Sequence, residues 1–260
     1  MKNKQKVPTC VSILGVNITS ISKEEVLSLV RAHLKKKKQL TIVTPNPEMI
    51  VEAQKNEPFR KALHSADVAI ADGTGLLFAE VVLYRSRKLK RVPGRLLMEG
   101  LFSLAKEEHL KVFLLGASSD VNAQAVKKLA GKVVVKGSHG FQVTKEGEAV
   151  SEVDRESQID VVERINKFQP DILCVAFGAP KQEQWITKHK DELKATIVVG
   201  VGGSLDYYVG QAKKPPYMVS YLGFEWFWRL LTQPTRLSRM YSALVVFPWL
   251  IVRQKIYGHH

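Results

Sequence analysis

Short apolar runs alternate with longer amphipathic segments along most of this 260-residue chain. Regular alternation of this kind predicts parallel strands joined by helical crossovers. Near-continuous apolar runs, such as 112–115, fit a sheet that is covered on both faces. We therefore predict an α/β fold built on a mostly parallel sheet with helices on both faces. The expected strands are 10–14, 40–43, 68–71, 112–115, 133–135, 172–177 and 196–201, and the expected helices are 23–34, 47–54, 76–84, 95–108, 120–129, 159–168 and 181–189.

The alternation ends near Gly210, which divides the chain into a predicted core, 1–210, and a C-terminal appendage, 211–260. The sequence of the appendage predicts long helical segments. Interruptions are expected at Pro234 and Pro248, because proline breaks the helical hydrogen-bond ladder. Within the core, the polar and glycine-containing segment 136–157 is expected to be a loop.

No part of the chain is expected to cross a membrane. The longest late apolar run, 241–252, contains Pro248 and is too short to span a bilayer as a helix. Residues 1–6 are basic without a long apolar run after them, so no signal peptide is expected. The two cysteines, Cys10 and Cys174, lie in predicted strands and do not form a disulfide framework, as is typical of a cytosolic protein.

The formal net charge of +14 predicts attraction to phosphate groups. The charge alone does not distinguish between nucleic acid, anionic lipid and a diphosphate substrate as the partner. Basic residues are not interleaved with aromatic ones as in nucleic-acid modules, so no nucleic-acid partner is expected. The histidines show no metal-ligand spacing, no Asp-x-Asp motif is present, and neither a metal nor a cofactor is expected.

Turn and capping residues follow many of the expected strands. In an open parallel sheet, ligands bind in the crevice outside the carboxyl ends of the strands. These turns are therefore expected to surround one site, and they comprise 44–47, 71–75, 116–119, 178–180 and 200–204.

Two glycines in the last of these turns, Gly202 and Gly203, allow backbone amides to bind a diphosphate at a helix start. A tight strand-to-helix turn explains them equally well. The turn is not the dinucleotide fingerprint, because Leu205 stands where that fingerprint needs a third glycine. Asp206 is either a contact to a base or ribose or an ordinary acid in a first helical turn.

Three polar residues in two earlier turns are candidate catalytic groups. Asp72 directly follows an apolar strand, and its carboxylate is suited to take a proton from an attacking hydroxyl, although a turn or cap is the plainer interpretation. Thr44 and Asn46 alternate with two prolines that fix the backbone, so their side chains are positioned for a ligand, while Asn46 also fits a helix cap. Gln182, in a helix first turn, is either a phosphate or sugar contact or a solvated residue.

Arg229, Arg236 and Arg239 fall at offsets of seven and three, which places them on one helix face unless Pro234 bends the helix. Three guanidinium groups can bind a diphosphate. The same residues, beside the aromatic segment 226–228, also suit a membrane surface or simple solvation.

The motifs, taken in order, resemble the WecG/TagA/CpsF glycosyltransferases over nearly the whole chain from about residue 10. Each motif alone is weak, and the ordered set is specific. The motifs are Thr44-Pro-Asn-Pro-Glu, Ala71-Asp-Gly-Thr-Gly, Arg91-Val-Pro-Gly, Phe113-Leu-Leu-Gly, Gly178-Ala-Pro-Lys-Gln-Glu and Gly200-Val-Gly-Gly-Ser-Leu-Asp.

The resemblance implies a Rossmann-like fold and a metal-independent, inverting glycosyl transfer. The basic, aromatic C-terminal segment makes the chain most similar to the family's wall teichoic acid linkage-unit enzymes. These transfer N-acetylmannosamine from UDP-N-acetylmannosamine to undecaprenyl-diphosphate-linked N-acetylglucosamine at the cytoplasmic face of the plasma membrane. The implied partners are a UDP-sugar, a polyprenyl-diphosphate acceptor and an anionic membrane surface.

The resemblance also implies roles for single residues. Asp72 is similar to the catalytic base, and Thr44 and Asn46 to sugar-pocket residues. The implied substrate-binding residues are Gln182 near the diphosphate, Asp206 near the uridine, the glycines Gly202 and Gly203, Arg91 from its own motif, and the appendage arginines Arg229, Arg236 and Arg239.

Other functions remain open at this stage. A family member that transfers another UDP-sugar, such as a uronate or glucose, to a different lipid-linked acceptor has the same fold and motifs. A nucleotide-dependent oxidoreductase is less well supported, since the dinucleotide fingerprint is incomplete. A noncatalytic membrane- or nucleic-acid-binding module is suggested by the net charge alone. The sequence does not fix the oligomeric state, and the appendage is compatible with a homo-oligomer.

Overall fold

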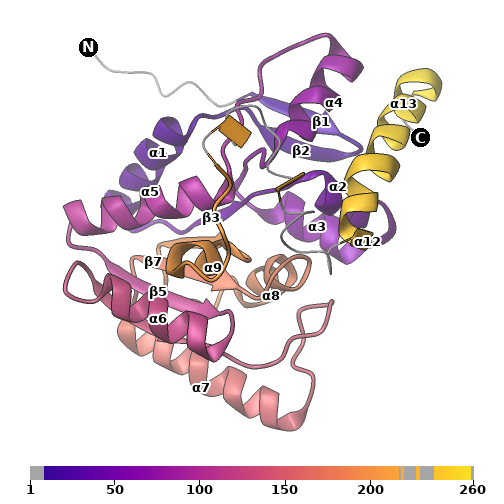
Figure 1. The fold of residues 1–260 in the computed structure, drawn as a ribbon. Helices are drawn as coiled ribbons and strands as arrows, with labels where there is room; N and C mark the ends of the chain where they lie inside the picture. The colour runs from indigo at the N-terminus through magenta and orange to yellow at the C-terminus, as the bar shows by residue number, and fades with distance from the viewer. Residues whose placement is uncertain (1–8, 217, 220–226, 229–236, 259–260) are drawn as a thin grey trace.

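A six-stranded parallel sheet forms the centre of the molecule. The computed structural model describes residues 9–216, 218–219, 227–228 and 237–258 (Figure 1). The strand order is β4-β3-β8-β7-β5-β6, with every neighbouring pair parallel. The predicted α/β, Rossmann-like fold is therefore confirmed. The strands are β3 (Leu40–Val43), β4 (Val68–Ala69), β5 (Lys111–Gly116), β6 (Val134–Ser138), β7 (Ile172–Ala176) and β8 (Ile197–Gly200).

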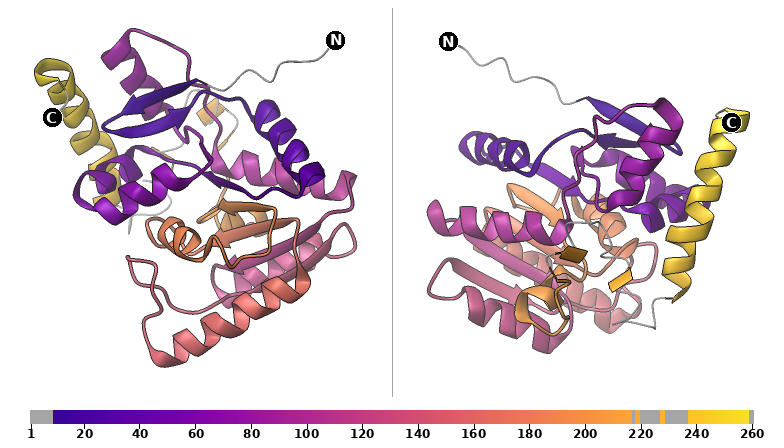
Figure 2. Two further views of the ribbon diagram at one scale, coloured as in Figure 1. Left: turned by 180° about the vertical axis from the view of Figure 1, so that it is seen from behind. Right: turned by 45° about the horizontal axis from the view of Figure 1, so that its top comes forward.

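Helices cover both faces of this sheet (Figures 1 and 2). Side chains alternate between the faces along each strand, so Leu114 and Cys174 belong to one core cluster while Phe113 and Val175 belong to another. The first face carries α1 (Lys23–Lys36), α5 (Gly94–Glu107), α6 (Ser119–Leu129) and α9 (Ser204–Val209). The second face carries α2 (Pro47–Lys55), α3 (Glu57–Ser65), α7 (Glu152–Phe168) and α8 (Lys181–His189).

An antiparallel hairpin lies beside the edge strand β4 and was not expected. The predicted strand 10–14 is β1 (Cys10–Ile13), which pairs with β2 (Val16–Thr19) rather than with the main sheet. The turn residues Leu14 and Gly15 both have positive φ, +48° and +76°, as a two-residue hairpin of the favoured hand requires. The hairpin packs with α2, α3 and α4 (Thr74–Tyr84) in a third core cluster.

The segment 136–157 was predicted as a loop, and both of its ends are instead regular. β6 continues to Ser138, and α7 begins at Glu152 with Ser151 as its N-cap. The first turns of α7 are solvent-exposed, with Val153 72% exposed, so they lack the apolar periodicity that marks a helix in sequence. Helix α3 was not predicted for a different reason. Asn56 both ends α2 and caps α3, so no turn segment separates the two helices in the sequence.

The C-terminal helical run continues through Pro248 instead of stopping there. α12 (Leu237–Tyr241), the π-helical turn η2 (Ser242–Val246) and α13 (Phe247–Tyr257) follow one another directly. The N–H of Phe247 donates to the carbonyl of Ser242, five residues back. A widened turn of this kind accommodates the missing N–H and the ring of a proline.

This C-terminal run lies against α4 and α2, far from it in sequence (Figures 1 and 2). Phe247 and Ile251 are fully buried in the cluster that also holds the hairpin. Lys255 Nζ donates to the carbonyl of Leu83 at 2.8 Å, and Gln254 Oε1 accepts from the amide of Leu14 at 3.3 Å. Residues 237–257 are thus joined to the predicted core, while the boundary at residue 210 stays a prediction.

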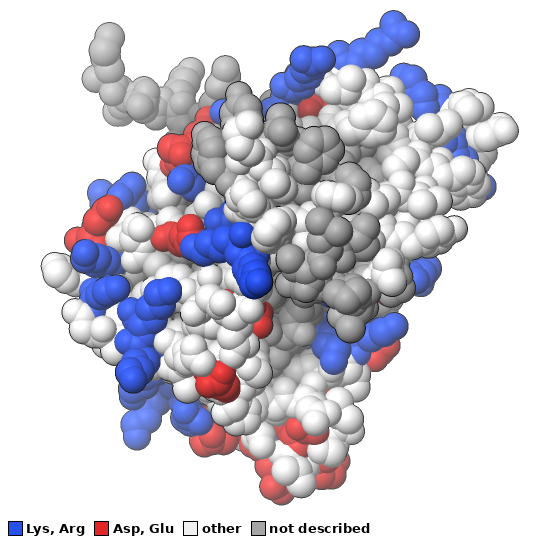
Figure 3. All heavy atoms as spheres, in the orientation of Figure 1, with Lys and Arg blue, Asp and Glu red and all other residues white. Residues whose placement is uncertain are grey.

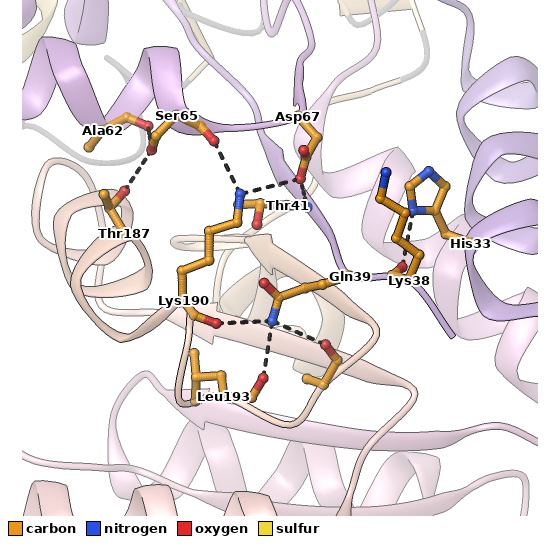
Figure 4. Close-up of polar contacts among 11 residues, drawn as sticks. His33, Lys38, Gln39, Thr41, Ala62, Ser65, Asp67, Thr187, Lys190 and Leu193 are labelled. Carbon is orange, nitrogen blue, oxygen red and sulfur yellow. Dashed lines mark hydrogen bonds and ion pairs between the residues drawn. The ribbon is translucent and has the colours of Figure 1, made fainter. Parts of the chain in front are cut away.

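Polar side chains connect the elements at the amino ends of the strands (Figure 4). Gln39 Nε2, just before β3, donates to the carbonyls of Lys190 and Leu193 at 3.2 and 3.0 Å. The ammonium group of Lys190 lies 3.7 Å from Asp67 Oδ2, which also accepts from the amide of Thr41 at 2.8 Å. These contacts fix β3, β4 and β8 at one end and leave the carboxyl ends of the strands for a site.

Candidate active site

Most of the predicted site residues meet in one polar cavity at the carboxyl ends of the strands. The cavity is lined by Thr44, Asn46, Met49, Asp72, Gly94, Gly178, Ala179, Gln182, Val201, Gly202, Gly203, Ser204, Tyr207 and Arg239. Its walls come from the turns after β4, β3, β8 and β7, which are neighbours in the sheet. The turn 116–119 was expected there as well, but it follows β5, beyond β7 in the sheet, and it does not line the cavity. A larger cavity of about 810 Å³ lies between the β1–β2 turn and the end of α13, and it contains none of the predicted site residues. We assign the site by its chemical groups and not by size.

Asp72 and Thr44 lie close together beside the start of α5. A Cβ atom placed on Gly94 would lie 3.2 Å from Thr44 Oγ1 and 3.7 Å from Asp72 Oδ2. Any larger residue at 94 would therefore enter the space beside both polar groups. The backbone fixes Asp72, since its amide donates to the carbonyl of Pro45 at 2.8 Å.

Asn46 has the cap role that the sequence allowed. Its side-chain oxygen accepts from the amide of Met49 at 3.0 Å, and Pro47 occupies the start of α2. Because the cap uses the oxygen, the NH₂ group is the part of Asn46 with hydrogens to donate into the cavity. The cap and a ligand contact are thus compatible.

Gln182 joins the turns after β7 and β8. Its side-chain oxygen accepts from the amides of Gly178 at 3.2 Å and Gly202 at 3.0 Å. A Cβ on Gly200 would lie 2.7 Å from Gln182 Nε2, so this close approach requires glycine. Gln182 therefore shapes the cavity wall, and one hydrogen of its NH₂ group is left for a ligand after the bond to Glu183.

Four helices begin at this cavity without a side-chain cap. Their N-cap residues are Gly73 for α4, Pro93 for α5, Pro180 for α8 and Gly203 for α9, none of which has a side-chain oxygen. By contrast, serine or asparagine caps α1, α3, α6 and α7. Uncapped amides and the positive ends of helix dipoles favour an anion. The cavity is thus electrostatically suited to a diphosphate.

Two arginines, Arg239 and Arg91, lie near Asp72. Arg239, on α12, lines the polar cavity and forms an ion pair with Glu48 of α2. Arg91 lines an adjoining groove together with Asp72. Its loop, 85–93, is fixed by the buried carboxylate of Glu80, which accepts from the amides of Lys88 and Leu89 at 2.7 and 2.9 Å.

Among the predicted site residues that the structure describes, Arg91 and Asp206 do not line this cavity. Asp206 lies on α9 and is not among the lining residues, so its role stays a prediction. Arg229 and Arg236 lie outside the described residues. Sequence reasoning in turn missed Met49, Gly94 and Tyr207, although Gly94 belongs to the Arg91-Val-Pro-Gly motif and could have been found there.

The comparisons with known proteins agree with this geometry. The profile of the glycosyl transferase WecG/TagA/CpsF family matches residues 11–260. The chain belongs to this family. Proteins from Staphylococcus aureus strains NCTC 8325 and MRSA252 are each 32% identical to it over 255 residues, covering 94% of this chain and 93% of the relative. Both are named N-acetylglucosaminyldiphosphoundecaprenol N-acetyl-beta-D-mannosaminyltransferase.

The described part of this WecG/TagA/CpsF glycosyltransferase shows neither a metal-ligand cluster nor a helix that could span a membrane. Over residues 9–216 and the shorter described segments, no three histidine, cysteine or acidic residues are grouped as a metal site would need. Within the same residues, no helix has the length and apolar character needed to cross a bilayer.

Glu183 is a buried acid directly behind the cavity wall of this glycosyltransferase. One carboxyl oxygen accepts from Gln182 Nε2 at 2.7 Å, and the side chain is almost fully buried. Burial raises the pKa of this carboxyl from 4.5 to about 7, and the hydrogen bond from Gln182 only partly opposes the rise. Nothing in the sequence indicates this burial beyond the place of Glu183 in the Gly178-Ala-Pro-Lys-Gln-Glu motif.

Replacing Glu183 by glutamine is expected to change how stability depends on pH. Between pH 4.5 and about 7 the unfolded chain loses the proton while the folded protein keeps it, so the wild type loses stability as pH rises through this window. The pKa difference corresponds to about 3 kcal/mol. Glu183→Gln removes this loss, because an amide does not ionise. Urea denaturation at several pH values between 4.5 and about 7 measures the free energy of unfolding, and Glu163→Gln, at an exposed position, is the control. The same pH dependence of this free energy in the wild type and both variants would contradict the prediction.

Proposed function

We propose that this protein transfers N-acetylmannosamine from UDP-N-acetylmannosamine to undecaprenyl-diphosphate-linked N-acetylglucosamine, with inversion and without a metal ion. The observation that supports this best is the position of Asp72. It lies where the polar cavity with its uncapped helix starts meets a second, largely apolar groove. The names of the Staphylococcus aureus relatives support the choice of sugar and acceptor.

In the proposed reaction, Asp72 takes the proton from the acceptor hydroxyl as its oxygen attacks the anomeric carbon. The new carbon–oxygen bond forms on the face opposite UDP, while the bond to the diphosphate oxygen breaks and UDP leaves. Thr44 and the NH₂ group of Asn46 hold the sugar beside Asp72. Negative charge grows on the departing diphosphate, and Arg239 with the backbone amides of the helix starts stabilises it.

The experiment that tests this function combines the protein with lipid-linked N-acetylglucosamine diphosphate and each of several UDP-sugars, and measures UDP release with and without a chelator. UDP should be released with UDP-N-acetylmannosamine only when the acceptor is present, and the chelator should have no effect. Release with a UDP-uronate or UDP-glucose instead would support the alternative donor. Release that the chelator abolishes would rule out the metal-free mechanism.

We further propose that the protein binds the anionic inner face of the plasma membrane through α13. Trp249, Val252 and Ile256 are 59%, 49% and 66% exposed and are spaced to share one helix face. Figure 3 shows the region of α4 and α13 as a mostly uncharged surface with lysine and arginine at its margins. Apolar side chains bordered by basic ones suit the interface of an anionic bilayer.

Membrane binding is expected to depend on that apolar face. The double variant Trp249→Glu, Ile256→Glu should bind anionic phospholipid vesicles at least about tenfold more weakly in sedimentation, because burial of two large apolar side chains is lost. Val153→Glu, at an exposed apolar residue on α7, is the control and should bind like the wild type. Equal binding by the two variants would show that α13 is not the contact.

A further inference from the structure

An apolar groove leads away from Asp72 between α4 and the C-terminal helical run. The groove has a volume of about 300 Å³, within the range of small-molecule sites. Its apolar side chains include Phe78 from α4 and Leu244, Phe247 and Pro248 from the C-terminal run. Neither the family match nor the names of the relatives assign a ligand to this groove.

We propose that this groove binds the first isoprene units of the acceptor's polyprenyl chain, with the acceptor diphosphate beside Arg91. This inference rests on the proposed function and adds the place where the lipid part of the acceptor lies. Its first support is charge complementarity. Arg91 lines the groove together with its apolar side chains, and an allylic diphosphate likewise combines a charged head with an apolar chain.

The second support is continuity with the polar cavity. Asn46, Asp72 and Arg239 line both spaces, so the two meet at the carboxylate that acts as base. In an inverting displacement the attacking hydroxyl and the leaving diphosphate must approach the anomeric carbon from opposite sides. An acceptor in the groove and a donor in the polar cavity reach Asp72 from different sides, as that geometry requires.

The third support is the exposure of the groove's rim. Phe78 is 55% exposed and Leu244 is 39% exposed, whereas Phe247 forms a buried floor. The rim of the groove is therefore accessible from outside the protein. A chain longer than the groove can continue from it into a lipid layer, so only the part nearest the diphosphate is recognised.

Adjacent residues in η2 supply a matched pair of variants. Leu244 lines the groove, whereas Val245 is 50% exposed and does not line it. Two soluble acceptors with the same N-acetylglucosamine diphosphate head, one with a farnesyl chain and one with an ethyl group, report chain recognition without a membrane. Leu244→Gln should lower the ratio of the kcat/KM values for the farnesyl and ethyl acceptors by at least about tenfold, the loss expected for one apolar contact. Val245→Gln should leave that ratio unchanged.

A direct binding measurement separates the groove from the reaction. A fluorescent farnesyl diphosphate should bind the wild type, and about tenfold more weakly to Leu244→Gln. If the probe binds in this way but no sugar is transferred, the proposed function is wrong while prenyl binding in the groove is supported. If both variants transfer sugar with the same ratio of kcat/KM values for the farnesyl and ethyl acceptors, prenyl binding in the groove is wrong while the proposed function stands. The same holds if phospholipid displaces the probe as readily as prenyl diphosphate does.

Discussion

Replacing Asp72 by asparagine is expected to lower the rate of sugar transfer by about a thousandfold and to leave UDP binding nearly unchanged. Asparagine has the shape of aspartate, but its amide cannot take up the proton that the attacking hydroxyl must lose. The site geometry should survive, because the hydrogen bond between the amide of residue 72 and the carbonyl of Pro45 belongs to the backbone. Single-turnover transfer and calorimetric UDP binding measure the two quantities.

Asp191→Asn is a suitable control for that experiment, since Asp191 is exposed and lies in the turn between α8 and β8, away from the cavity. It should transfer sugar at the wild-type rate. Near-wild-type turnover by Asp72→Asn would remove Asp72 from the mechanism. Loss of UDP binding together with turnover would instead make Asp72 a ligand-binding residue.

The location of the site was predictable from the sequence because it depends on local features. β3, β7 and β8 are buried on both faces, so their sequences are continuous apolar runs, which predict parallel strands. Each is followed at once by the turn that lines the cavity. Parallel strands bring their carboxyl ends to one edge, and sequence order alone therefore places Thr44, Gln182 and Gly202 together.

Features that depend on contacts between distant segments were not predictable. Glu183 looks like an ordinary acid in a first helical turn, and only its burial behind Gln182 raises the pKa of its carboxyl to about 7. The apolar groove requires that α4 and the C-terminal run lie side by side, and nothing local to Phe78 or Leu244 indicates that pairing. The helical path through Pro248 likewise depends on the anchoring of Phe247 and Ile251 in the core.

Replacing Arg239 by alanine is expected to lower kcat for transfer by about a hundredfold, the usual loss when one charged donor to a developing negative charge is removed. Arg239 comes from the far end of the chain and is the one predicted appendage arginine within the described residues. Its ion pair with Glu48 holds the guanidinium at the junction of the polar cavity and the groove. The UDP-sugar KM should change less than kcat, because charge on the diphosphate grows as the bond breaks.

Lysine at position 239 should restore part of the lost rate, since it returns the positive charge but not the planar, paired donors of arginine. Arg253→Ala is the matched control: Arg253 lies on α13 over the ring of Trp249 and lines neither the polar cavity nor the groove. It should transfer sugar in solution at the wild-type rate. If the alanine variants at 239 and 253 lose rate equally, the effect is one of overall charge. A metal-free site would then need its leaving-group stabilisation from the helix starts alone.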